Sequence, residues 1–284
     1  MHPILFRLPE WIPYLGGAGL HIYGLMIALG FLIGMRYVKN EAKRVGLDVE
    51  KILDLFFWVM VAGLVGSRLM YFLTEPTGQI WSNPLVFFKV WQGGLVFQGG
   101  ILGAFPVVLY YVKRHKMPFF KVADVFIPPL SLGHGLGRIG CFFAGCCWGG
   151  QCSIDFPLAL VFPHNDDVTT GLPFEVPLYP TQLGEALGEF LIFGFLLYYR
   201  NRKSFDGAVL LIYLMIYSSL RIFIEFFRGD VQRGYILQPR VPGVAGLENW
   251  FQDPYVSVGQ FMSLMMIIVA AFAWVYLRNK KKAL

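Results

Sequence analysis

The chain has 284 residues, of which 56% are hydrophobic and only 15% are charged, and its formal net charge is +6. A mean hydropathy of +0.56 lies far above the average for soluble globular proteins and excludes an ordinary water-soluble domain. The basic residues flank apolar segments and form no separate basic domain, so the positive charge does not indicate nucleic-acid binding.

Long apolar windows follow one another along the whole chain. A bilayer core about 30 Å thick requires about 20 apolar residues per helix. Seven windows meet this requirement, at residues 20–38, 52–73, 93–112, 122–143, 182–199, 207–227 and 257–277. We therefore expect an all-α polytopic membrane protein with about seven transmembrane helices, forming a single integral membrane domain over residues 1–284.

The distribution of Lys and Arg predicts the orientation of these helices, because cytoplasmic loops are enriched in basic residues. Basic clusters follow the first, third, fifth and seventh windows, whereas residues 145–180 contain no Lys or Arg. We expect a periplasmic N-terminus and a cytoplasmic C-terminus. Segments 145–181 and 229–256 are then periplasmic and are expected to cap a site within the membrane.

The third window begins with the glycine-rich run GGLVFQGGILG at residues 93–103. Small residues allow two helices to approach closely, which is one interpretation of this run. The other is an interrupted span that presents Gln98 to a cavity, since irregular backbone at membrane depth must line a cavity or be buried in protein. The pattern alone does not separate the two.

Several charged side chains lie inside the predicted spans, where each costs roughly 2.5–3.5 kcal/mol at the bilayer centre. They are Arg68, Arg138, Glu185, Glu189, Arg221, Glu225 and Arg228. Arg221, Glu225 and Arg228 share one helical face, and a self-neutralising ion-pair ladder is the simplest interpretation of such a stripe. Three arginines on different spans nevertheless favour a cationic surplus that binds an anionic ligand, above all a phosphate.

In the fourth span, His134, Arg138 and Cys141 also share one helical face. A lone histidine in a span is more often a structural hydrogen-bonding group than a catalyst. One turn from an arginine, however, its neutral form is favoured, and a neutral imidazole can accept a proton.

All four cysteines fall within twelve residues, at Cys141, Cys146, Cys147 and Cys152. Their C-x4-C-C-x4-C spacing differs from the paired CxxC motifs of structural zinc sites, so we expect no metal. A disulfide from Cys146 or Cys147 to Cys152 is expected to tie the external loop, with Cys141 as a small buried apolar residue. The cluster also leaves open a membrane thiol oxidoreductase, and the arginines an anion transporter, although no internal repeat of spans supports a transporter.

An ordered set of motifs resembles the prolipoprotein diacylglyceryl transferase family over nearly the whole chain. The motifs are IYGLMIALGF near Tyr23, GSRLMYFL from Gly66, GGLVFQGGILG from Gly93, GRIGCFFAGCCWG from Gly137, YPTQLGE from Tyr179, RIFIEFFRGD from Arg221 and SVGQ from Ser257. Each block alone is weak, but their order is specific to this family.

The resemblance implies a bacterial inner-membrane enzyme without cofactor. Its reaction transfers the diacylglyceryl group from phosphatidylglycerol, a membrane lipid, to the lipobox cysteine of prolipoprotein signal peptides. By position in the motifs, Arg138 and Arg221 would handle the phosphate and Glu225 would orient Arg221. The residues expected to shape the substrate site are Tyr23, Gln98, Gln182, Glu185, Arg228 and Gly149.

The chain departs from the family's motifs at two places. The family usually has a histidine, proposed as the base, where this chain has Gln98. Cys141, Ala144 and Cys146 stand where the signature commonly has two asparagines and an acid. Because glutamine cannot accept the thiol proton, we hypothesise that His134 does so. The rival is that no base is needed, since a thiol with a pKa of about 8.5 ionises readily in an arginine-rich field.

Overall fold

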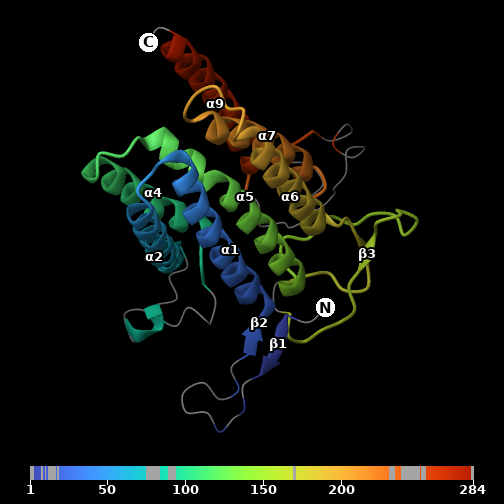
Figure 1. Cartoon of the computed structure of the whole chain (residues 1–284). Coiled ribbons are helices and arrows are strands. Elements are labelled where there is room, and N and C mark those ends of the chain that lie inside the picture. The colour runs from blue at the N-terminus through green and yellow to red at the C-terminus, as the bar shows by residue number, and fades with distance from the viewer. Residues whose placement is uncertain are drawn as a thin grey trace. The chain divides into compact units, whose positions relative to one another are not determined.

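The computed structural model describes residues 3–7, 9, 11, 17, 19–74, 84–88, 94–168, 171–229, 234–237, 250 and 254–282 (Figure 1). Within these ranges, seven long helices make up most of the structure. They are α1 (Ile22–Val45), α2 (Val49–Thr74), α4 (Phe97–Arg114), α5 (Phe119–Ala144), α6 (Thr181–Tyr199), α7 (Ala208–Glu225) and α9 (Val258–Lys282). A short 3-10 helix, η1, covers Pro84–Phe88.

Each of the seven predicted windows falls on one of these helices, which confirms the all-helical architecture. Four helices in the described ranges, α1, α2, α7 and α9, are long and apolar enough to cross a membrane. Helices α5 and α6 lie outside this set. They carry the histidine, arginine and glutamate residues singled out above, which lower their hydropathy.

Many large apolar side chains are exposed, whereas several charged side chains are buried. Phe97 and Phe272 are each 74% exposed, whereas Glu185 and Glu225 are only 2% and 1% exposed and Glu189 is completely buried. In water such an arrangement would be unfavourable, because apolar surface would be hydrated and charge desolvated. It suits a bilayer, in which buried ionisable groups face the interior of the helix bundle.

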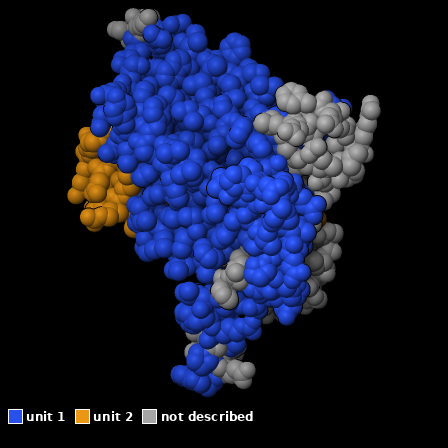
Figure 2. All heavy atoms as spheres, turned by 90° about the vertical axis from the view of Figure 1, so that its right-hand side faces the viewer, with its two compact units in different colours: residues 1–34, 126–284 blue, residues 35–125 orange. Residues whose placement is uncertain are grey.

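The chain divides into two compact units, residues 1–34 with 126–284 and residues 35–125 (Figure 2). The smaller unit contains α2 packed against α4. A Cβ at Gly99 would lie 2.3 Å from the carbonyl oxygen of Gly66, and one at Gly103 would lie 2.4 Å from that of Ala62. Close packing through small residues therefore accounts for these glycines of the GGLVFQGGILG run.

The start of α4 bears on the second interpretation of this run, that of an interrupted span. The helix begins only at Phe97, after Gly94 with its left-handed φ of +71°. The predicted span at residues 93–112 is therefore helical from Phe97 onward. Gln98 lies in the first turn of this helix.

Local sequence signals explain the turn between α1 and α2. Gly46 adopts a φ of +71° directly after α1, and Asp48 then accepts hydrogen bonds from the backbone N–H groups of Glu50 and Lys51. An aspartate at this position satisfies donors that the first turn of α2 leaves open. The hydrogen bond from the Lys51 side chain holds the pKa of Asp48 below its usual range.

The larger unit contains α5, α6, α7 and α9, and α7 packs against both α6 and α9 (Figure 1). Between α6 and α7 lies an apolar cluster of Ile192, Leu196, Val209 and Tyr213. The first part of α1 belongs to the same unit and approaches α5 closely. A Cβ at Gly30 would lie 3.3 Å from the Cα atom of Gly133.

The described residues of the segment 145–181, which is expected to cap the site, include two short strands. Strands β3 (Leu160–Val161) and β4 (Pro177–Leu178) pair antiparallel over a small apolar cluster of Phe162, Leu172 and Leu178. Two further antiparallel pairs belong to the larger unit. These are β1 (Ile4–Arg7) with β2 (Gly19–His21) and β5 (Tyr235–Leu237) with β6 (Val256–Ser257).

Three backbone hydrogen bonds tie the ends of α5 and α7 to the start of α6, and we call them the backbone clasp. Gly150 N–H donates to the carbonyl of Phe227 at 2.8 Å, Tyr179 N–H to that of Gly150 at 3.0 Å, and Gly229 N–H to that of Trp148 at 3.2 Å. The clasp fixes where these three helices stand relative to one another at this end of the unit.

Candidate active site

Three helices of the larger unit each carry a stripe of polar residues three or four positions apart, so each stripe occupies one helical face. Hydrogen bonds and ion pairs between the stripes show that they meet in the interior. The residues are Ser131, His134 and Arg138 on α5; Glu185 and Glu189 on α6; and Tyr213, Tyr217, Arg221 and Glu225 on α7.

Glu185 links two of the predicted arginines. Its Oε1 lies 3.0 Å from Arg138 Nη2, and its Oε2 lies 3.5 Å from Arg221 Nη1. Glu225 contacts Arg221 from the same helix, with Oε2 2.7 Å from Nη2. The structure thus brings Arg138, Arg221, Glu185 and Glu225 together.

His134 lies at the other end of the same network. Its Nδ1 is 2.6 Å from Oε1 of Glu189, and its Nε2 accepts a hydrogen bond from Arg138 Nε at 3.2 Å. In this arrangement Nδ1 faces the Glu189 carboxylate, and Nε2 is the acceptor for Arg138. Ser131 donates to Glu189 Oε2 at 2.6 Å, and Tyr213 donates to Oε1 at 3.4 Å. The buried carboxylate therefore fixes the orientation of the ring.

Arg138 and Arg221 face two carboxylates, those of Glu185 and Glu225. The carboxylate of Glu189 lies in the same interior against His134. Buried charges persist when they are paired and hydrogen-bonded, which explains the extra acids. Arg221 Nη1 is buried and, although it lies 3.5 Å from Glu185 Oε2, it makes no hydrogen bond within the described residues.

Other predicted residues surround this network. Gln182 donates from Nε2 to the carbonyl of Cys146 at 3.1 Å. Gly149 forms a β-bridge with Arg228, and a Cβ on it would lie 2.2 Å from the carbonyl oxygen of Tyr179. Gly149 is thus a packing position of the clasp, since no side chain fits there. Tyr23 packs on α5, where a Cβ at Gly140 would lie 2.8 Å from its ring.

Two residues singled out from the sequence belong to the smaller unit. Gln98 lies on α4, and Arg68 lies on α2. Arg68 donates from Nε, Nη1 and Nη2 to the backbone carbonyls of Phe87, Gly94 and Val86 at 3.1, 3.1 and 2.7 Å. These three carbonyls belong to the same unit as Arg68.

All four cysteines are free thiols, so the expected loop disulfide is not formed in this structure. Cys146 and Cys147 instead gather with Cys141. Hydrogen bonds with the thiols of Cys141 and Cys146 hold the pKa of Cys147 below its ordinary value. Burial raises the pKa of the Cys152 thiol.

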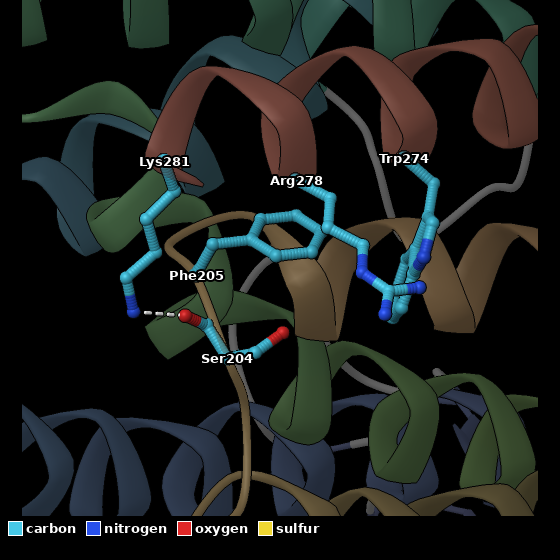
Figure 3. A pocket seen from close by; sticks show the side chains of 5 residues that line it. All are labelled: Ser204, Phe205, Trp274, Arg278 and Lys281. Carbon is cyan, nitrogen blue, oxygen red and sulfur yellow. Dashed lines mark hydrogen bonds between the residues drawn. The ribbon is translucent and has the colours of Figure 1, made fainter. Parts of the chain in front are cut away.

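A hollow of about 360 Å³ lies elsewhere in the larger unit, between α9 and the segment that precedes α7 (Figure 3). Trp274, Arg278 and Lys281 of α9 line it together with Ser204 and Phe205, and Lys281 Nζ donates to the carbonyl of Ser204. None of the residues that line it belongs to the network around Glu185, so this hollow is not the candidate site.

Comparison with known proteins identifies the family. A family model described as prolipoprotein diacylglyceryl transferase matches residues 10–276. The chain belongs to this family. Proteins called phosphatidylglycerol–prolipoprotein diacylglyceryl transferase from Photobacterium profundum, Shigella boydii and Clostridium tetani are 36%, 32% and 30% identical to it. These matches cover 95%, 97% and 99% of this chain and 94%, 97% and 100% of the relatives.

Membership of the transferase family confirms the resemblance that the ordered motifs indicated, and the chain is a transferase rather than a thiol oxidoreductase or an anion transporter. Sequence reasoning left Glu189 without a role and overlooked Ser131, Tyr213 and Tyr217. A signal for them was present. Ser131, Glu189 and Tyr217 each stand three or four residues from an assigned polar residue, and Tyr213 stands four residues before Tyr217, so each lies on the face of an assigned residue.

Proposed function

We propose that this chain transfers the diacylglyceryl group of phosphatidylglycerol to the lipobox cysteine thiol of prolipoproteins, the first step of lipoprotein maturation. The relatives carry this activity in their names. The observation that carries the proposal is the contact of Arg138 and Arg221 with one carboxylate, that of Glu185, because it directs two guanidinium groups from different helices to one place.

Arg138 and Arg221 are the proposed phosphate-binding residues. A guanidinium group presents five N–H donors in a planar fork that matches phosphate oxygens. The buried Nη1 of Arg221, which makes no hydrogen bond within the described residues, is a donor that a phosphate oxygen would satisfy. Fixed guanidinium groups in a water-poor interior stabilise the negative charge that stays on the departing glycerol phosphate.

The transfer is a substitution at the diacylglyceryl carbon that bears the phosphate ester. The cysteine sulfur forms a C–S bond to this carbon while the C–O bond to the phosphate breaks. The electron pair of the C–O bond leaves with glycerol phosphate. The thiol proton goes to a base and finally to water or to the phosphate, so the reaction needs no oxidant or metal to balance.

His134 is the proposed proton acceptor, with Glu189 holding the ring in the tautomer whose Nε2 is unprotonated. In this structure, Nε2 accepts a hydrogen bond from Arg138 Nε at 3.2 Å. Proton transfer therefore requires Arg138 to turn away from the ring. A phosphate group that binds Arg138 would draw its guanidinium away from His134. Lipid binding would thus free Nε2 of His134 to accept a proton.

The remaining residues of the site are assigned supporting roles. Tyr23, Gln98, Gln182 and Arg228 are proposed to shape the phosphatidylglycerol site, Glu225 to orient Arg221, and Gly149 to keep the backbone clasp closed. The clasp and the Gln182–Cys146 hydrogen bond support this assignment within the larger unit.

The proposed location is the bacterial inner membrane, with seven spans, a periplasmic N-terminus and a cytoplasmic C-terminus. The four apolar helices and the outward-facing apolar side chains support a membrane location. The segments at 145–181 and 229–256 are proposed as periplasmic caps of the single membrane domain. This places the site on the side where prolipoprotein signal peptides emerge.

The decisive experiment incubates purified protein with phosphatidylglycerol and a lipobox peptide and detects the thioether product by mass spectrometry. We expect product from the wild type and from the matched control Arg202→Lys, whose guanidinium stacks on Tyr198 outside the network. Absence of product while a thiol probe reports redox cycling of the cysteines would refute the transferase function.

A second measurement separates the two roles that His134 can have. If it is the base, His134→Asn lowers kcat by about 10²–10⁴-fold and alters its dependence on pH. If it only positions Arg138, the same variant raises KM for phosphatidylglycerol and leaves kcat and the pH profile near those of the wild type. Near-normal turnover would eliminate the base hypothesis.

A further inference from the structure

Three thiols that the transferase reaction does not use lie together at the end of α5. The Sγ atoms of Cys141, Cys146 and Cys147 are all within 4.8 Å of one another. Among the described residues, this is the one group of at least three His, Cys, Asp or Glu side chains with metal-ligating spacing. Each of the three is partly buried.

The backbone gathers these thiols by two left-handed residues. Gly145, with a φ of +71°, follows the last residue of α5, and Cys146 N–H bonds back to the carbonyl of Cys141 at 3.1 Å. Cys147 then adopts a φ of +59°, although it is not a glycine. Such a conformation costs about 1–3 kcal/mol and persists only where the surroundings impose it. The strained turn is what brings Cys147 back beside Cys141.

Helix α6 supplies those surroundings. Thr181 Oγ1 donates to the carbonyl of Cys147 at 3.1 Å, and Gln182 Nε2 donates to that of Cys146, also at 3.1 Å. Both donors are buried. Hydrogen bonds of this kind position a ligand set before any ion binds, which lowers the entropic cost of binding.

The spacing of the sulfur atoms suits a thiophilic ion. Zinc–sulfur bonds of about 2.3 Å at tetrahedral angles place sulfur atoms about 3.8 Å apart. The observed limit of 4.8 Å lies within 1 Å of that separation, so side-chain rotation alone can close the site. Thiolates are soft ligands that select Zn²⁺ and Cu⁺ over Mg²⁺ or Ca²⁺.

We propose that Cys141, Cys146 and Cys147 bind one Zn²⁺ ion, with the fourth position of its coordination shell left to water. This assignment replaces the expectation, drawn from linear spacing, of no metal and a loop disulfide. Linear spacing failed as a guide because one ligand comes from a helix and two from a strained turn. The transfer reaction balances without this ion.

The test uses the full-length protein in detergent, reduced and freed of metal. Zn²⁺ is added, and peptide mass spectrometry measures the rate at which maleimide labels each cysteine. We expect binding of one equivalent of Zn²⁺, with at least tenfold protection of Cys141, Cys146 and Cys147 and unchanged labelling of Cys152. Co²⁺ in place of Zn²⁺ should give the intense charge-transfer absorption of cobalt–thiolate bonds.

Two matched variants complete the test. Cys147→Ser removes one ligand and is expected to weaken Zn²⁺ binding by more than about tenfold. Cys152→Ser removes the one cysteine outside the cluster and should leave binding unchanged. Lack of zinc binding, protection that includes Cys152, or a disulfide that resists reduction would overturn the proposal. Should Cys147→Ser fail to fold, the protection pattern of the wild type still decides.

Discussion

Arg68 and the pair Arg138 and Arg221 show two ways in which a helix buries an arginine. In the smaller unit, every nitrogen of the Arg68 guanidinium donates to a backbone carbonyl, and the group also lies 5.0 Å from the ring centroid of Phe72. In the larger unit, Arg138 and Arg221 face carboxylates, and Arg221 Nη1 is buried without a hydrogen bond within the described residues.

The difference teaches that the partners of a buried arginine, rather than its depth, indicate its role. The guanidinium of Arg68 donates to the carbonyls of Val86, Phe87 and Gly94 and so links these residues to α2. Carboxylates orient Arg138 and Arg221 and hold their charge ready for an anion. Two arginines that look alike in sequence are thus expected to fail in different ways when substituted.

The largest effect is expected for the phosphate-binding arginines. Arg138→Ala or Arg221→Ala should lower kcat by about 10²–10³-fold, as the loss of a charged donor at a developing negative charge does. Arg138→Lys should recover only part of this loss, because an ammonium group cannot bind phosphate bidentately. Product formation by mass spectrometry gives the rates. Full activity of both alanine variants would remove the contrast with Arg68.

Arg68→Ala should lower the stability of the protein more than its rate of transfer. Three partly buried backbone carbonyls lose their donor, and we expect the free energy of unfolding to fall by roughly 2–4 kcal/mol. Protein that remains folded should transfer diacylglyceryl groups within about threefold of the wild-type rate. Unfolding in mixed micelles and turnover at low temperature measure the two quantities. A stable but inactive Arg68→Ala would show that this arginine also serves catalysis.

Glu185→Gln tests how the two phosphate-binding arginines are held. The amide keeps the shape of the carboxylate but gives up the charge that faces both guanidinium groups. We expect KM for phosphatidylglycerol to rise about tenfold, equivalent to about 1.4 kcal/mol, with a smaller change in kcat. Glu50→Gln, on the first turn of α2, is the matched control. A change confined to kcat would instead assign Glu185 to the chemical step.

The smallest effect is expected at the hollow beside α9. Lys281 is exposed and donates to the carbonyl of Ser204, and exposed polar contacts of this kind contribute little. Lys281→Ala should change neither the rate of transfer nor KM by more than about twofold. A large rise in KM would mean that basic groups outside the arginine network also bind the lipid headgroup.

Hydropathy predicted the seven helices because it is a local property of each window, and helical spacing predicted the Arg221–Glu225 ion pair because both residues lie on one helix. The same reasoning could not predict the bridging role of Glu185. That role depends on the register between α5, α6 and α7, which packing and the backbone clasp determine.

Two further features were out of reach of linear patterns. The cysteines gather because Cys147 adopts an unfavourable left-handed conformation. Side chains of Thr181 and Gln182 donate hydrogen bonds to the carbonyls of Cys147 and Cys146. Glycines at residues 93–103 fit two interpretations, and the structure supports packing at Gly99 and a break before Phe97. In both cases, the outcome depends on what a second segment of the chain contributes.

The backbone clasp also has a consequence for the order of events during synthesis. Trp148 and Gly150 leave the ribosome well before Phe227 and Gly229, their partners in the clasp. Contacts between segments so far apart form late, because a long loop must close first. Until then, the ends of α5 and α7 cannot be joined. The clasp can therefore form only after α7 has been synthesised.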